Sequence, residues 1–377
     1  MKLFSFPYLI QKEILDHLSI NHIFFLSLCS KNTKNFIKET LKHQLKKVER
    51  VTYCINGSIM YIRIKMINAI YNSHEIYLFK SEADFQPLMG KYFVQEVRVN
   101  ELATPIDFLR CLTTNSNLHA KYSPDTVEPI IESIHSQLYD LLGNDTKFWL
   151  KSFDFTEEEG TFFLPLLQNI QKMDVYGTIF ESTKIDEFLD RSTCLEHFWW
   201  DTSSTQPIQL RANSKFYDLD TVYVCSPPPD YYACPLTNDV LKRFNGRHVF
   251  LNSGNITTPD VLQFLNEWKS GEKYKNLELI SVYWRFNIQE IRNSVEIKEV
   301  DREVKYSFIT KYEDHHFSFS HLKSGEFKSR WYMVRESDSR VASVMLTPQL
   351  IMMGVWKMTE KEFLINFNQP SEAVPFL

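Results

Sequence analysis

Residues 6–38 read FPYLIQKEILDHLSINHIFFLSLCSKNTKNFIK and hold three short apolar clusters, each separated from the next by a few polar residues. Pro7 is placed like a residue in the first turn of a helix, where its missing N–H is not needed. Large apolar residues then recur at helical spacing, at Leu9, Ile10, Ile14, Leu15 and Leu18. The pattern predicts a short amphipathic helix at the start of the chain.

Two further helices are expected directly after the first. Ser19 and Ser30 can each cap a helix, because a serine hydroxyl accepts a hydrogen bond from the first turn. Each of the three helices spans roughly ten to fourteen residues, and helices that short depend on tertiary packing. Three of them cannot hide this many large apolar side chains from water unaided. The sequence therefore predicts that another surface covers them.

The same stretch resembles an F-box, which reads Leu-Pro, then Ile-Leu, then Leu-Ser, then Ser-Leu-Cys-Ser-Lys. The resemblance covers roughly residues 3–43. It departs from the usual pattern at several positions. One of them is His22, which stands where Asp is common and so weakens the usual acidic first turn of the second helix. The matching positions are Phe6-Pro7, Ile14-Leu15, Leu18-Ser19 and Ser27-Leu28-Cys29-Ser30-Lys31.

An F-box implies docking onto the Skp-family linker subunit of a cullin–RING ubiquitin ligase. In that case the excess apolar surface is completed by the partner. The alternative is a helical hairpin folded against the body of its own chain, with no partner. The residues expected to contact the linker are Phe6, Pro7, Ile10, Ile14, Leu15, Leu18, Ile23, Phe24 and Leu28.

Residues 46–146 are a mixed strand and helix region that connects this module to the rest. VTYCI, SIMYIRIKMI, EIYLF and VQEVRV have the β-branched and aromatic content of strands. Residues 123–143 predict a helix that ends at Gly143. Its apolar side is formed by Ile130, Ile131, Ile134, Leu138 and Leu141.

From residue 147 onward a template of the form apolar-x-x-apolar-x-apolar repeats. Its middle residues are Phe153, Met173, Phe198, Val222, Val249 and Ile280, in steps of 20, 25, 24, 27 and 31 residues. Helix-like stretches lie between several copies, at residues 161–170, 183–192, 237–244 and 258–270. Strands and helices alternating at this period predict a leucine-rich-repeat-like solenoid. An ordinary α/β domain with irregular spacing is the alternative.

Residues 258–284, TPDVLQFLNEWKSGEKYKNLELISVYW, resemble the F-box-associated type-2 domain of a large nematode family. The matching features are Phe264-Leu265 before Trp268-Lys269, then Asn276-Leu277-Glu278 and Ile280-Ser281. VASVML followed by MMGVWK resembles the end of the same domain, although SDSRVAS lacks the usual glycine turn.

Composition narrows the class of protein. The 377 residues suffice for a small module and a larger body. A net charge of -5 argues against a nucleic-acid partner. The six cysteines form no CxxC pair, which favours free thiols in a reducing compartment. The apolar runs are too short for a signal peptide or a membrane span. We expect a cytoplasmic or nuclear protein with no membrane partner.

No pattern for catalysis is evident. His315 and His316, with Asp314 and His321, lack the spaced carboxylate or cysteine of a metal site, and the acidic residues 157–159 fit the start of a helix. Phosphate-binding glycine loops and GxSxG are absent. We expect no enzyme activity, metal or cofactor. The candidate contacts to a protein target are Trp199, Tyr231 and Tyr232.

The sequence thus predicts an α+β or α/β chain in four parts. These are a three-helix F-box at residues 1–45, the connecting region 46–146, a leucine-rich-repeat-like F-box-associated body at 147–290, and a C-terminal β-rich part of that body at 291–377. The expected function is a substrate-recognition adaptor, reaching cullin and RING subunits through the linker and binding an unknown protein substrate. The alternative is a linker-binding scaffold without a role in degradation.

Overall fold

The computed structural model describes residues 3–56, 59–67, 73–79, 92–94, 107–111, 118–121, 127–154, 164–177, 182–202, 209–225, 234–252, 255–309 and 325–367. The chain divides into two compact units, which are treated separately below. Unit 1 comprises residues 1–179 and 187–195, and unit 2 comprises residues 180–186 and 196–377. Helix α7 (Ser182–Arg191) contributes residues to both.

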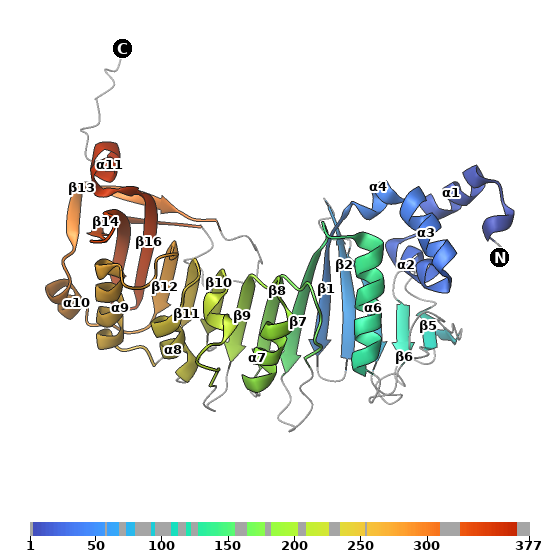
Figure 1. Ribbon diagram of the computed structural model, residues 1–377, viewed down its shortest axis with the longest axis horizontal. Coiled ribbons are helices and arrows are strands. Elements are labelled where there is room, and N and C mark those ends of the chain that lie inside the picture. Colours follow the sequence, from blue (N-terminus) through green and yellow to red (C-terminus); the bar gives the residue numbers. More distant parts are fainter. Residues whose placement is uncertain are drawn as a thin grey trace, which may run out of the picture. The chain divides into compact units, whose positions relative to one another are not determined.

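Unit 1 begins with the three expected short helices, α1 (Tyr8–Asp16), α2 (Ile20–Cys29) and α3 (Lys31–Thr40) (Figure 1). The structure adds two elements that the sequence did not predict, the 3-10 turn η1 (Leu3–Ser5) and helix α4 (Lys42–Leu45).

The two serines expected as caps behave differently. The Ser30 hydroxyl accepts a hydrogen bond from the Thr33 N–H at 3.1 Å, which caps α3 as predicted. Ser19 occupies the N-cap position of α2, but its hydroxyl bonds to His22 Nδ1 at 2.7 Å and makes no capping bond. A histidine at that position therefore engages the hydroxyl that would otherwise cap the helix.

The strands of unit 1 run in the order β8-β7-β1-β2-β3-β6-β5-β4. The parallel pairing of β1 with β7 crosses the border that the sequence suggested between residues 146 and 147. Strands β1 and β2 pair antiparallel, and β7 and β8 pair parallel. The strand bounds are β1 (Val48–Asn56), β2 (Ile59–Met66), β3 (Ser73–Phe79), β4 (Tyr92–Val94), β5 (Asp107–Cys111), β6 (Leu118–Lys121), β7 (Lys147–Asp154) and β8 (Lys172–Gly177).

Helix α6 (Val127–Leu142) lies against the β1–β2 part of this sheet (Figure 1). All five apolar residues predicted for its inner side are buried, and Gly143 ends the helix with a φ of 81°, as expected. Helix α2 packs against α6. On the outside, Lys34 and Lys38 of α3 hold the Asp140 carboxylate at 2.9 and 2.7 Å. The N-terminal helices are therefore anchored to the sheet through α6.

Unit 2 contains the strands in the order β13-β14-β15-β16-β12-β11-β10-β9. The four strands from β9 to β12 are parallel and in register, with Phe198, Val222, Val249 and Ile280 side by side. Strand β16 then pairs antiparallel with β12. The bounds are β9 (His197–Thr202), β10 (Thr221–Cys225), β11 (His248–Asn252), β12 (Leu279–Tyr283), β13 (Lys298–Ser307), β14 (Glu326–Val334), β15 (Arg340–Thr347) and β16 (Leu350–Thr359).

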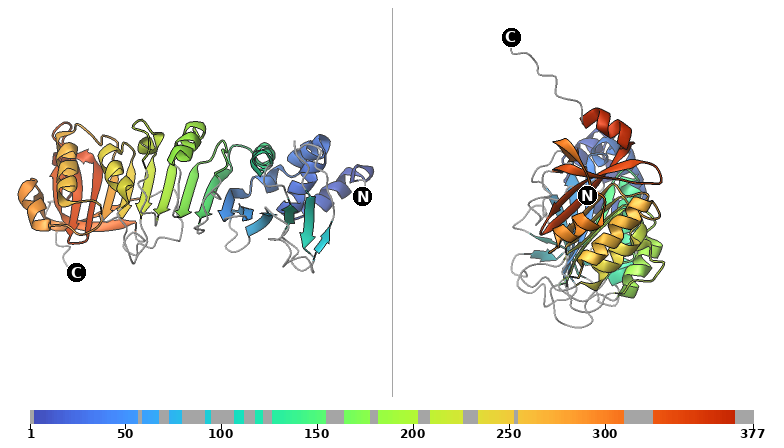
Figure 2. Two further views of the ribbon diagram at one scale, coloured as in Figure 1. Left: turned by 90° about the horizontal axis from the view of Figure 1, so that it is seen from below. Right: turned by 90° about the vertical axis from the view of Figure 1, so that its left-hand side faces the viewer.

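Helices α8 and α9 of unit 2 lie on one face of the β10–β12 strands (Figures 1 and 2). Helix α9 begins with a capping box between Thr257 and Asp260 and ends at Gly271, whose φ is 79°. The remaining bounds are η4 (Lys215–Asp218), α8 (Pro235–Arg243), α9 (Thr258–Ser270), α10 (Ile288–Ser294) and α11 (Glu360–Phe367).

The middle residues of the repeat template are in register from β9 to β12, whereas the template failed at its beginning. Met173 pairs with Leu150 and not with Phe153, so the first copy is displaced by three residues. The helix expected over residues 161–170 is wrong in its described part, since residues 164–170, which include Pro165, form no helix. The structure is a mixed α/β protein with a helical N-terminal region and a β-rich C-terminal part.

Gly354 on β16 leaves room for the Tyr306 ring, which projects from β13. A Cβ at this position would overlap the Tyr306 ring. That ring packs edge-on against Trp356, and its hydroxyl donates to the Glu278 carbonyl at 2.8 Å.

We predict that Gly354→Ala lowers the free energy of unfolding by about 1–3 kcal/mol, because the added methyl group displaces a buried ring. Urea denaturation followed by circular dichroism measures this change. Combining the substitution with Tyr306→Ala should make the two effects non-additive, and strict additivity would contradict the proposed contact.

Candidate functional site

Unit 1 carries an exposed apolar patch that we call the N-terminal surface. It consists of Phe4, Phe6, Tyr8, Leu9 and Ile10. Leu9 is 75% exposed, and Ile10 is 48% exposed. Phe4, Phe6 and Tyr8 are also exposed. Isolated exposed apolar residues are ordinary, whereas five within seven positions form a patch of the kind found at interaction sites.

This surface is held in place from beneath. The Phe36 ring on α3 makes edge contacts with Phe4 at 5.6 Å and Tyr8 at 6.2 Å between ring centroids. Gln11 Nε2 donates a hydrogen bond to the Phe6 carbonyl, and Leu15 fills the interior one turn later. The apolar side chains are therefore presented on a packed support.

The nine residues expected to contact a linker fall into two groups. Phe6, Pro7 and Ile10 are exposed, and Ile14 and Leu18 are half-buried. The other four are at most 1% exposed, so they form the core of the helical module and are not available to a partner in this conformation. They are Leu15, Ile23, Phe24 and Leu28.

Sequence reasoning missed Phe4, Tyr8 and Leu9 as surface residues. Helical periodicity alone places Leu9 with the core-facing residues, because it does not say which side of α1 meets α2 and α3. Pro7 indicated where α1 begins, but no pattern in the sequence indicated which of its side chains stay exposed.

Trp199 was expected to face a protein target. It does lie on the face of β9 opposite the fully buried Trp200, but it is only 8% exposed. Its ring stacks on Tyr223 at 4.9 Å, which stacks on Phe250 at 4.1 Å. These contacts make Trp199 part of an aromatic row across the sheet, which corrects its assignment as an exposed contact.

Several expectations lie outside the described residues. They concern Tyr231, Tyr232, Asp314, His315, His316, His321 and the acidic residues 157–159.

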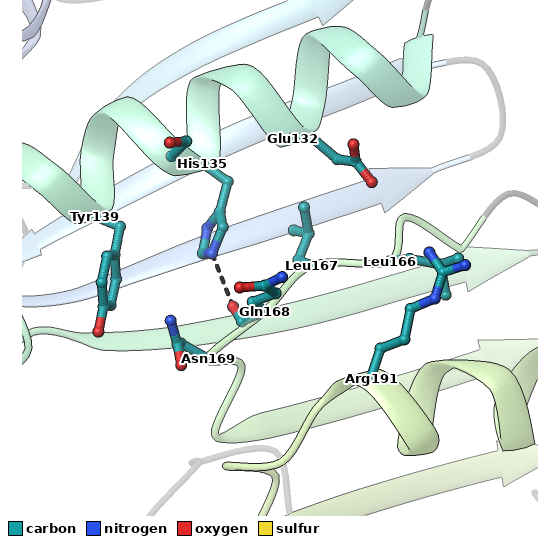
Figure 3. A pocket seen from close by; sticks show the side chains of 9 residues that line it. Glu132, His135, Tyr139, Leu166, Leu167, Gln168, Asn169 and Arg191 are labelled. Atoms are coloured by element: carbon teal, nitrogen blue, oxygen red, sulfur yellow. Dashed lines mark hydrogen bonds between the residues drawn. The ribbon is translucent and has the colours of Figure 1, made fainter.

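A pocket of about 470 Å³ lies in unit 1 between α6, the segment 166–169 and the end of α7 (Figure 3). His135 projects from α6 into its wall. The His135 Nε2 atom lies 2.8 Å from the Gln168 carbonyl, and its Nδ1 atom lies 2.8 Å from the Tyr53 hydroxyl. Because a carbonyl only accepts, Nε2 carries the proton and Nδ1 accepts from the tyrosine.

This arrangement gives His135 a structural role. Burial lowers the pKa of its imidazole, which favours the neutral ring. Both ring nitrogens are engaged by partners within unit 1, so neither is left to take a proton from a ligand. The ring instead connects β1, α6 and the segment before β8.

Two further described groups with perturbed ionisation lie on the neighbouring strands β9 and β10 of unit 2. Burial raises the pKa of Asp201, at the end of β9, to about 6. Burial also raises the pKa of the Cys225 thiol on the paired strand, which keeps it protonated and weakly nucleophilic. Among the described residues, no three His, Cys, Asp or Glu side chains are grouped as a metal site would require.

Comparison with known proteins identifies one part of the chain. Residues 3–44 match the family model described as F-box domain. No curated protein and no solved structure matches the chain. Within its described residues, no helix combines the length and apolar character needed to cross a membrane.

The residues that suggested an F-box-associated type-2 domain have mainly structural positions. Phe264, Leu265 and Trp268 form the buried side of α9, while Ile280 and Ser281 are buried on β12. The match to a family model covers none of them.

We predict that Asp201→Asn raises the free energy of unfolding at pH 8 by about 2 kcal/mol. The folded-state pKa lies above the ordinary 3.8, so burial of the charged carboxylate destabilises the fold increasingly from about pH 4 and fully above about pH 6. The advantage of the variant should shrink as the pH falls from 6 towards 4, because the carboxyl is then protonated in the folded state while it is still partly ionised in the unfolded state. Urea midpoints between pH 4 and 8 measure this, with the exposed Asp145→Asn as the control. A pH-independent difference would contradict the explanation.

Proposed function

We propose that the protein is a substrate-recognition adaptor of a Skp–cullin–F-box ubiquitin ligase. The observation that carries the proposal is that the F-box match at residues 3–44 includes the N-terminal surface, whose apolar side chains are exposed on a packed support. F-box proteins are generally adaptors, and an F-box implies binding to a Skp-family linker subunit.

The division of residues within the module supports a docking role. The core of the module is formed by Leu15, Ile23, Phe24 and Leu28, and its helix α2 packs against α6. The apolar side chains that stay exposed near η1 and α1 are not part of that core. A stable interface buries about 800 Å² on each partner, with an apolar centre. The N-terminal surface would supply that centre, and the half-buried Ile14 and Leu18 would extend it.

In this proposal the rest of the chain binds a protein target. Transfer of ubiquitin then becomes effectively intramolecular, because the target is held near the conjugating enzyme that the ligase recruits. The in-register parallel strands of unit 2 support a leucine-rich-repeat-like body. The resemblance of residues 258–284 to the F-box-associated type-2 domain of a nematode family is the ground for proposing that domain here. Such an adaptor would work in the cytoplasm or the nucleus.

A scaffold that binds the linker without promoting degradation is the second candidate. The two are separated by the fate of bound proteins in cells. If the protein is an adaptor, disrupting the N-terminal surface should raise the cellular level of its target proteins. If it is a scaffold, the same change should leave their level unaltered.

We predict that Leu9→Asp with Ile10→Asp reduces recovery of the Skp-family linker in co-purification by at least about tenfold, since two charges would be buried in an apolar interface. Both side chains are exposed in the free chain, so the fold should tolerate the change. The exposed Ile309→Asp, in unit 2, is the matched control and should leave recovery intact.

Undiminished recovery of the linker by the double variant would refute this interface. Substituting the fully buried Leu15 would not be informative, because an aspartate there would unfold the module and abolish binding for an unrelated reason.

A further inference from the structure

The pocket between α6, the segment 166–169 and the end of α7, which we call the α6–α7 pocket, arises from the way the chain crosses the sheet. Residues 164–170 lead into β8 without forming a helix. An α-helix with its side chains is about 10 Å across, whereas an extended segment covers less of the sheet beside it. The segment therefore leaves room for the hollow of about 470 Å³ next to α6.

Both walls of the α6–α7 pocket are fixed by hydrogen bonds to this segment. On the α6 side, His135 Nε2 donates to the Gln168 carbonyl at 2.8 Å. On the α7 side, the Ser192 hydroxyl donates to the Leu167 carbonyl at 3.1 Å. The pocket is therefore formed before any ligand arrives, as most small-molecule sites are.

One end of the α6–α7 pocket carries two opposite charges. Glu132 projects from α6 and Arg191 from the end of α7, and both reach toward the same end of the pocket (Figure 3). Both residues are exposed, and neither side chain makes a hydrogen bond or an ion pair with a described residue. One carboxylate and one guanidinium are therefore available to a ligand at this end.

The rest of the α6–α7 pocket is apolar with a polar far end. Leu166 and Leu167 line it, and the Tyr139 ring, which packs on Phe148 at 5.7 Å between ring centroids, forms a further wall. Tyr139 and Asn169 lie at the end away from the two charges (Figure 3). A ligand that fits would carry charges of both signs at one end and an apolar body behind them.

We propose that the α6–α7 pocket binds a free α-amino acid with a large side chain. The carboxylate of the ligand would accept two hydrogen bonds from the Arg191 guanidinium, a geometry that arginine favours, and its ammonium group would donate to Glu132. The side chain of the ligand would lie along Leu167 and the Tyr139 ring. This inference stands apart from the adaptor role and does not depend on it.

Two features favour this class of ligand over others. An anion alone would leave Glu132 unmatched, and a cation alone would leave Arg191 unmatched, whereas an amino acid carries both charges on neighbouring atoms. The volume of the pocket lies within the range of about 300–1,000 Å³ that is usual for small-molecule sites. A large side chain fills more of this space than a small one does.

Isothermal titration calorimetry of the full-length protein tests the proposal. The probes are free phenylalanine, tyrosine, tryptophan, leucine and glycine, together with the analogues of each large amino acid that lack either the amino group or the carboxylate. We expect at least one of the four large amino acids to bind. Its two analogues should bind at least about tenfold more weakly, because each loses a charge-assisted contact. Glycine should also bind more weakly, since it buries no apolar side chain.

Substitutions at the charged end give a second measurement. Arg191→Gln and Glu132→Gln should each weaken binding of that amino acid by at least about tenfold. The matched controls are Lys147→Gln and Glu39→Gln, which remove charges from exposed positions of unit 1 outside the pocket and should leave binding unchanged. Circular dichroism and the thermal midpoint confirm that all four variants fold.

The proposal would be overturned if none of the four large amino acids binds, or if the analogues lacking one charge bind as tightly as the amino acid itself. Equal losses in the pocket variants and the matched controls would also overturn it. Linker co-purification is measured in parallel and should be unaffected by Arg191→Gln, so failure of the amino-acid site and failure of the adaptor role are told apart.

Discussion

Unit 1 depends on helix α6, which packs on the sheet on one side and on the N-terminal helices on another. Its apolar residues lie on the sheet, and His135 bonds to Tyr53 of β1 and to the Gln168 carbonyl. Helix α2 packs against α6, and hydrogen bonds from Lys38 and Lys34 lower the pKa of Asp140 near its end. Partly exposed ion pairs of this kind stabilise by about 1 kcal/mol, so apolar packing between α2 and α6 provides most of the attachment.

This attachment determines which side of the F-box region remains open. The side of α2 and α3 that meets α6 is sealed by the chain itself, whereas η1 and α1 lie away from it. Of the two alternatives suggested by the sequence, the structure bears on the folding of the helices against their own body, while docking onto a linker stays a proposal. The helices do fold against their own body, and they also keep an apolar surface exposed on the opposite side.

Sequence patterns predicted elements well where local rules operate. Residues 258–270 and the inner side of α6 followed directly from caps and 3.6-residue periodicity. The patterns failed where tertiary pairing decides, since the register of Leu150 with Met173 depends on the neighbouring strand and not on spacing along the chain. For the same reason, periodicity could not separate the buried Leu15 from the exposed Leu9.

The aromatic row on β9, β10 and β11 restricts which amino-acid substitutions the sheet can accept in evolution. Because the strands are parallel and in register, Trp199, Tyr223 and Phe250 occupy equivalent positions, and each ring forms part of the site of the next. Residues in direct contact have non-additive effects on stability. A smaller ring at one position favours a larger one beside it, so these three positions should vary together between related chains.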